Sequence, residues 1–191
     1  MSPGDRFPAR KDVLPPEQRQ TYEQIEARRG TVPAPFLPLL ASPKVADAFE
    51  RFSASLWSGC LAKDLQEAVF LVTARAYRCD HQWRQHEKKA LAAGVSAGAV
   101  AAMQAGRAPS AAEADARLGA VIRFADELHA KQSVPDDVFQ AVATHLGPAE
   151  LSELVAFCAL AASIALLLNV GESNAARKDQ ARRGGPPVFQ A

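Results

Sequence analysis

The chain has 191 residues, of which 48% are hydrophobic and 23% are charged, and its formal net charge is +1. This length fits a single domain with a short arm, and it is enough to bury a core without disulfide bonds. The near-neutral charge gives no reason to expect nucleic acid or an anionic membrane surface as a partner.

Prolines crowd the start of the chain, where eight of the thirteen lie within the first 43 residues. Because proline interrupts helices, this part cannot be one long helix. We predict an extended Pro-rich arm over residues 1–16 and a helix over 17–29 that ends at Gly30. The following stretch, 31–43, is predicted to be an ordered apolar loop that packs on the body or on a neighbour.

The signals become helical from Ser42 onward. Ser42 and Pro43 supply an N-cap and a proline at the first helical position. Apolar residues then follow with the spacing of one helix face, namely Val45, Ala48, Phe49, Phe52 and Leu56. Two further helices are predicted over 65–77 and 81–93, and Gly94 ends the second of them.

The second half of the chain continues the helical pattern. Ser96 is placed to cap a short helix, and Ser110 with Glu113 forms a capping box that predicts a helix through about Lys131. Pro135 begins another helix, which runs to about His145.

Residues 154–170 are apolar and uncharged, and the helix that contains them begins after Gly147. Glu153 and Glu172 flank the run without an aromatic belt, so we expect a buried helix and no membrane span. A helix that is apolar all round is typical of a large core or an oligomer interface. Residues 172–183 should end the helical part. With no strand-like alternation in the sequence, the predicted fold is all-α, with one domain over 17–183 and a tail over 184–191.

The three cysteines are Cys60, Cys79 and Cys158. They are too scattered for a disulfide framework or a zinc knuckle, so no metal site is predicted. The N-terminus has no apolar segment of the secretory kind, and a reducing cytoplasm is the expected location.

One short segment, AYRCDHQWRQHEKKA over 76–90, gathers a cysteine, two histidines and a tryptophan. Cys79 and His86 are seven residues apart, which places them on one helix face. Glu67 lies too far back to meet them on a straight helix. A chain reversal at residues 78–80, with Asp80 as the N-cap of the next helix, would bring the three side chains together.

A carboxylate, an imidazole and a thiol in one place suit general acid–base chemistry, and a helix N-terminus favours a Cys79 thiolate. The structural alternatives stay open. The Glu67–His86 pair can be an ordinary hydrogen bond, and Cys79 a small buried hydrophobe. Trp83 can be a substrate contact or core packing, and His81 an exposed helix-start residue.

Two arginines near the reversal, Arg78 and Arg75, are candidates to bind a substrate carboxylate, although both can also be plain surface residues. Arg78 is the one assigned to substrate binding. His129 and His145 lie late in their helices, where a cation is favoured, and neither is assigned to chemistry.

The segment LQEAVFLVTARAYRCDHQWRQHEKKALAAGVS resembles the core of the carboxymuconolactone decarboxylase and alkyl hydroperoxidase D-like (AhpD-like) family. In that pattern an apolar helix with a Glu precedes a Cys-led turn and a His helix. The landmarks here are Glu67, Cys79, His86, Gly94 and Ser96. The resemblance spans roughly residues 17–175 and implies an all-helical subunit that assembles into trimers or hexamers.

The resemblance implies two chemistries, neither of which needs a cofactor. The first is acid–base decarboxylation of a small carboxylated or lactone compound, with Glu67, Cys79 and His86 at the site. The second is peroxide reduction by a Cys-x-x-Cys pair, but Gln82 stands where the second cysteine would be. Cys60 or Cys158 would have to replace it. A non-catalytic oligomer that binds a small molecule is the third possibility.

Overall fold

The computed structural model describes residues 6–7, 11–171 and 188–189. Every regular element in that part of the chain is a helix, so the predicted all-α fold is confirmed. The elements are η1 (Lys11–Val13), α1 (Pro16–Arg29), η2 (Ala34–Ala41), α2 (Pro43–Trp57), α3 (Lys63–Ala76), α4 (Asp80–Ala92), α5 (Ala97–Ala105), α6 (Ala116–Lys131), α7 (Asp136–Ala143) and α8 (Pro148–Gly171).

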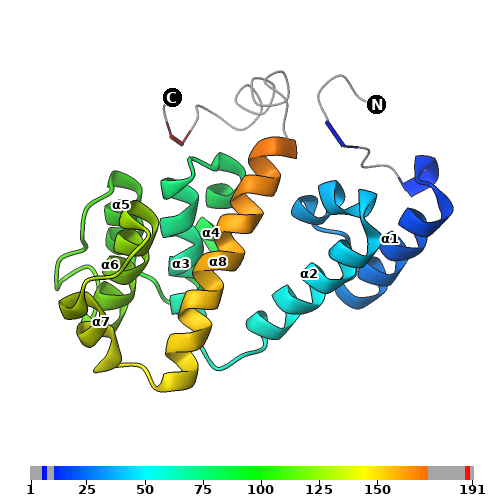
Figure 1. The fold of residues 1–191 in the computed structure, drawn as a ribbon. Helices are drawn as coiled ribbons and strands as arrows, with labels where there is room; N and C mark the ends of the chain where they lie inside the picture. The colour runs from blue at the N-terminus through cyan, green and yellow to red at the C-terminus, as the bar shows by residue number, and fades with distance from the viewer. Residues whose placement is uncertain (1–5, 8–10, 172–187, 190–191) are drawn as a thin grey trace. The chain divides into compact units, whose positions relative to one another are not determined.

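The residues that the structure describes form two compact units (Figure 1). The first contains the residues up to Trp57 together with the last part of α8 from Leu166, and the second contains Ser58–Ala165 with residues 188–189. The predicted division into an arm, one domain over 17–183 and a tail remains a prediction. Its helical segment 172–183 lies outside the described residues.

The first unit begins less extended than predicted. Residues Lys11–Val13 form a 3₁₀ turn, and the Leu14 side chain after it is buried at 2% exposure. Helix α1 ends as expected at Gly30, whose φ of 77° suits glycine and whose N–H donates to the Glu26 carbonyl.

The apolar stretch after Gly30 is a 3₁₀ helix, η2, where a loop was predicted. Prolines forbid a long α-helix, but their fixed φ is close to that of a 3₁₀ helix. Phe36 and Leu40 of η2 are buried in one cluster with Ile25 and Ala46, so the expectation that this stretch packs inward is correct.

The predicted inner face of α2 is mostly wrong. Leu56 is buried, but Val45 and Phe52 are 50% and 43% exposed. The buried positions include Glu50 and Ser53, each with 1% exposure. Arginines at the end of α1 make this possible, because they neutralise a carboxylate that would otherwise be too costly to bury.

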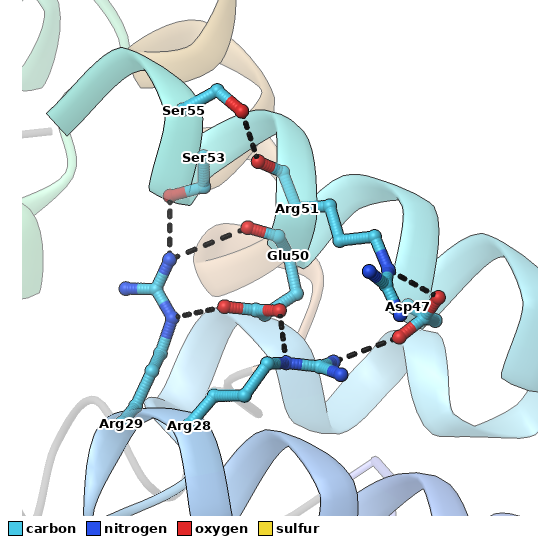
Figure 2. A network of polar contacts seen from close by, with 7 residues as sticks. All are labelled: Arg28, Arg29, Asp47, Glu50, Arg51, Ser53 and Ser55. Carbon is cyan, nitrogen blue, oxygen red and sulfur yellow. Dashed lines mark hydrogen bonds and ion pairs between the residues drawn. The ribbon is translucent and has the colours of Figure 1, made fainter. Parts of the chain in front are cut away.

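Figure 2 shows this cluster. Glu50 Oε1 accepts a hydrogen bond from Arg29 Nε at 2.8 Å, and Glu50 Oε2 forms an ion pair with Arg28 Nε at 2.7 Å. Arg29 also donates to the Ser53 hydroxyl at 3.2 Å, and Arg28 to Asp47 at 2.8 Å. The cluster therefore ties α1 to α2 through charges that an apolar periodicity does not register.

Glu50→Gln is expected to destabilise the protein by about 1.5–3 kcal/mol, because two guanidinium groups lose a buried anion. Chemical denaturation followed by circular dichroism measures this. The matched control is Arg51→Gln, since Arg51 is 66% exposed in its pair with Asp47 and its replacement should leave the stability nearly unchanged. Equal losses in the two variants would contradict the assignment of the cluster as a stabilising element.

Helix α3 forms the centre of the second unit and contacts α4, α5 and α6. All residues from Leu65 to Ala74 are buried, which includes Gln66, Glu67 and Thr73. A helix buried on every side places its few polar groups where water cannot reach them, so their partners in the protein determine their state.

The start of α6 corrects another expectation. Ser110 N–H does donate to the Glu113 carboxylate at 2.7 Å, but this pair closes only a turn. The helix begins after Asp115, whose carboxylate accepts the Leu118 N–H at 2.7 Å. The Glu113 carboxylate instead binds Arg107, which lowers the pKa of Glu113 to about 2.

Helix α8 is long and apolar enough to cross a membrane, but the core helix of a soluble protein can meet the same criterion, and 44% of its most apolar segment is buried. Leu154, Phe157 and Ala161 are fully buried, whereas Val155, Leu166 and Val170 are about half exposed. We predicted that this helix would be buried, and within this chain it is buried along one side.

Candidate active site

The chain reverses between α3 and α4, as predicted. After Ala76 the backbone leaves the helix, and Arg78 adopts a φ of 50°. Cys79 N–H donates to the Ala74 carbonyl at 2.8 Å, and the Cys79 carbonyl accepts the first α4 bond from Trp83 N–H. The N-cap is therefore Cys79, and the expectation that Asp80 would cap α4 is wrong, because Asp80 is already its first residue.

The reversal brings Glu67 and His86 into contact. His86 Nδ1 lies 2.7 Å from Glu67 Oε2, and the two residues are 8% and 1% exposed. The Phe70 ring stacks on the imidazole with centroids 4.2 Å apart, and Lys63 Nζ lies 3.7 Å from the other Glu67 oxygen. The pair is thus enclosed by α3 on one side and held in one orientation.

Burial lowers the pKa of His86 below its usual value of 6.5, and the hydrogen bond that His86 donates to Glu67 only partly offsets that effect. The imidazole is therefore neutral near pH 7. Because a carboxylate can only accept, Nδ1 carries the hydrogen and Nε2 carries the lone pair. This arrangement suits a group that takes up a proton at Nε2 and releases it again.

Cys79 is the N-cap residue of α4. It lies about two helical turns before His86, roughly 10 Å along α4, and its side chain is 1% exposed. None of the three cysteines, all of which the structure describes, is in a disulfide. The predicted contact between the carboxylate and the imidazole is therefore present, and the thiol is buried about two turns earlier on the same helix.

Trp83, predicted as a substrate contact, is 1% exposed. Its ring packs edge-to-face against Phe189, with centroids 5.4 Å apart. The Asp80 carboxylate accepts the backbone N–H groups of Val188 and Phe189 at 3.0 and 3.1 Å. Sequence reasoning missed this contact, since nothing local connects Asp80 to a segment more than a hundred residues away.

Phe189→Ala is expected to expose Trp83, with a red shift of its fluorescence, and to cost about 0.5–1.5 kcal/mol of stability. Emission spectra and acrylamide quenching measure the exposure. Phe139→Ala is a suitable control, because Phe139 is a 42% exposed ring on α7. An unchanged spectrum would show that Phe189 does not cover Trp83 in solution.

The arginines differ in their surroundings. Arg75 binds the Asp126 carboxylate, whereas Arg78 is exposed at the reversal.

The surroundings of His129 do not favour a cation, although its place late in α6 does. Burial, followed by the Arg75 charge, lowers the pKa of His129, and its Nε2 lies 2.8 Å from the Thr73 hydroxyl.

His81 is half-buried, less exposed than predicted. Within the described ranges, no three His, Cys, Asp or Glu side chains are grouped so that they could hold a metal ion.

A helical hairpin that buries a Glu–His pair across a Cys-led turn defines an all-helical protein of the AhpD-like kind. Residues 43–127 match the Carboxymuconolactone decarboxylase family. Over this segment the chain is similar to the carboxymuconolactone decarboxylase and AhpD-like family, which supports the resemblance that its sequence indicated.

Two solved structures are similar to the chain. One is the alkylhydroperoxidase AhpD core, an uncharacterized peroxidase-related protein from Ralstonia eutropha JMP134, with 25% identity, a TM-score of 0.62, and coverage of 89% of this chain and 91% of that one. The other is the debrominase Bmp8, solved as a Cys-to-Ala variant with 2,3,4-tribromopyrrole, with 16% identity, a TM-score of 0.65, and coverage of 92% and 95%. None of the curated proteins compared with the chain matches it.

Proposed function

We propose that the protein is a carboxymuconolactone decarboxylase-like enzyme that removes carbon dioxide from a small carboxylated or lactone compound without a cofactor. The observation that carries the proposal is the buried Glu67–His86 pair, with its 2.7 Å hydrogen bond. A neutral imidazole held by a carboxylate is equipped to move one proton repeatedly, which is the chemistry that decarboxylation requires.

In the proposed reaction the bond between the substrate carbon and its carboxylate breaks, and the electron pair stays on that carbon. Carbon dioxide leaves, and His86 passes to that carbon the proton that its Nε2 took up from the substrate at the start of the reaction, which returns the imidazole to its neutral form. Solvent then returns a proton to the substrate group that lost it. Glu67 holds the ring through Nδ1 and stabilises the imidazolium whenever it forms.

Arg78 is the cation that we propose to bind the substrate carboxylate. Its side chain is exposed at the start of α4, whereas Arg75 is already bound to Asp126. Trp83 and Cys79 would line the site as apolar and weakly polar surfaces. We also propose that the enzyme works in the cytoplasm as a trimer or hexamer, and the half-exposed apolar side chains of Leu166 and Val170 on α8 are available to an interface between subunits.

Peroxide reduction through Cys79 is the second candidate, favoured by the similarity to the peroxidase-related protein from Ralstonia eutropha and by the place of Cys79 at the start of a helix. Three features weigh against it. Gln82 replaces the resolving cysteine, burial raises the pKa of the Cys158 thiol to about 12, and local desolvation followed by the Glu153 carboxylate raises the pKa of the exposed Cys60 thiol. Neither is therefore an effective second thiolate.

Cys79→Ser separates the two candidates. Decarboxylation should retain activity within about ten-fold of the wild type, because a hydroxyl can replace a thiol that only lines the site, whereas peroxide consumption should be abolished because no sulfenic acid can form. The measurements are carbon dioxide release from lactone acids and consumption of tert-butyl hydroperoxide by the purified protein. Peroxide turnover that is lost with Cys79, in a protein that releases no carbon dioxide, would replace the decarboxylase proposal with the peroxidase.

A further inference from the structure

Gln82 is buried at 1% exposure on α4, about one turn after Cys79 and one turn before His86. Its Nε2 donates to the Phe70 carbonyl at 3.1 Å. The Phe70 ring is also the one that stacks on His86. One residue of α3 therefore positions both the amide of Gln82 and the imidazole of the candidate site.

The orientation of the Gln82 amide follows from its partner. A backbone carbonyl only accepts hydrogen bonds, so the amide nitrogen must face Phe70 and the oxygen must face elsewhere. That oxygen, Oε1, is buried and meets no hydrogen-bond donor among the residues that the structure describes. A buried acceptor without a donor is unfavourable, and folded proteins contain few of them.

A second buried glutamine on the neighbouring helix shows the usual outcome. Gln66 is 2% exposed, its Nε2 donates to the Leu61 carbonyl at 2.8 Å, and its Oε1 accepts from Lys63 Nζ at 3.3 Å. Both ends of the Gln66 amide are satisfied by the protein, whereas Gln82 has only its donor end satisfied. The difference marks Gln82 as the side chain with an acceptor available to a ligand.

We propose that Gln82 is a ligand-positioning and specificity-determining residue whose Oε1 accepts a hydrogen bond from an O–H or N–H group of a small molecule bound against His86. This inference rests on the proposed function and narrows its substrate class to carboxylated compounds that also carry a hydroxyl or a ring N–H. A site built around a buried acceptor discriminates against ligands that lack the donor, because they leave the acceptor unmet.

The test uses two probes of the same shape and charge, pyrrole-2-carboxylate and furan-2-carboxylate. The first has a ring N–H, and the second has a ring oxygen in its place. Titration calorimetry on the full-length wild type should show about ten-fold tighter binding of the pyrrole acid, the effect of one net hydrogen bond. In Gln82→Met the two affinities should become equal through loss of the pyrrole preference.

Thermal unfolding provides a readout that needs no ligand. Gln66→Met, the matched control, should lower the Tm by several degrees, whereas Gln82→Met should stay within about two degrees of the wild type, because it also removes the unmet acceptor. Gln66→Met should retain the preference for the pyrrole acid.

Three results would overturn the proposal: equal or absent binding of both probes by the wild type, a preference that survives in Gln82→Met, or equal losses of Tm in the two variants. The first and third are expected if an internal water satisfies Oε1. Failure of the proposed function is distinct from all three, since it would appear as an absence of carbon dioxide release, or as release that does not depend on His86.

Discussion

Replacement of His86 by glutamine is expected to lower the kcat of carbon dioxide release by about 10²–10⁴-fold, the usual contribution of a general acid–base group. The physical reason is the loss of a titratable side chain that contacts Glu67 and whose charge changes near neutral pH. Glutamine preserves polarity and can still donate to the Glu67 carboxylate, so the fold should survive. Carbon dioxide release under saturating substrate measures the effect.

His145→Gln is the control for this variant. His145 is an exposed histidine just beyond α7, so its replacement should leave turnover within about two-fold of the wild type. Circular dichroism should show the same helical content in both variants. Unchanged turnover in His86→Gln on a confirmed substrate would remove His86 from the mechanism and leave the Glu67–His86 pair as a structural hydrogen bond.

Replacement of Glu67 by glutamine is the second large effect that we expect, a fall in kcat/KM of about 10²-fold. The amide can still accept a hydrogen bond from Nδ1, so the ring keeps its orientation, but the negative charge that stabilises the imidazolium is gone. Glu67 raises the pKa of His86 against the larger effect of burial, and without its charge that pKa should fall further below 6.5.

The direction in which pH changes kcat/KM follows from the neutral form of the His86 imidazole, which is the form that can take up a proton. If His86 begins the cycle as a base, the wild-type rate should be lost as the pH falls through the pKa of His86, below 6.5. In Glu67→Gln this acid limb should move to lower pH, while the rate on the plateau is smaller. The pH profile of kcat/KM for the two proteins measures both effects.

The double variant Glu67→Gln/His86→Gln serves as the control for coupling. Because Glu67 acts through His86, the double variant should be no slower than His86→Gln alone. A loss equal to the product of the two single losses would contradict this, as would an acid limb that stays in place.

Local signals in the sequence were sufficient for most of the helices and for the central pair of the site. Gly30, Ser96 and Pro148 act at short range, so they end, cap and begin helices as predicted. The reversal before α4 also followed from local residues, and it placed Glu67 against His86.

The predictions that were wrong share a cause, because each concerns a residue whose environment is set by partners distant in the sequence. The inner face of α2 is set by Arg28 and Arg29, whose charges draw Glu50 inward in place of the apolar Val45 and Phe52 (Figure 2). The expected cation at His129 is absent because burial and Arg75 oppose it. Neither effect leaves a trace in hydrophobic periodicity.

By itself, the sequence determined an all-helical fold and the turn that joins the acid and imidazole helices, because helix caps and periodicity act over a few residues. Only the tertiary structure decided the neutral state of His86, the cover of Phe189 over Trp83, and the unmet acceptor of Gln82. Each of these depends on desolvation and on contacts between segments far apart in the chain. Such contacts exist only once the helices have packed.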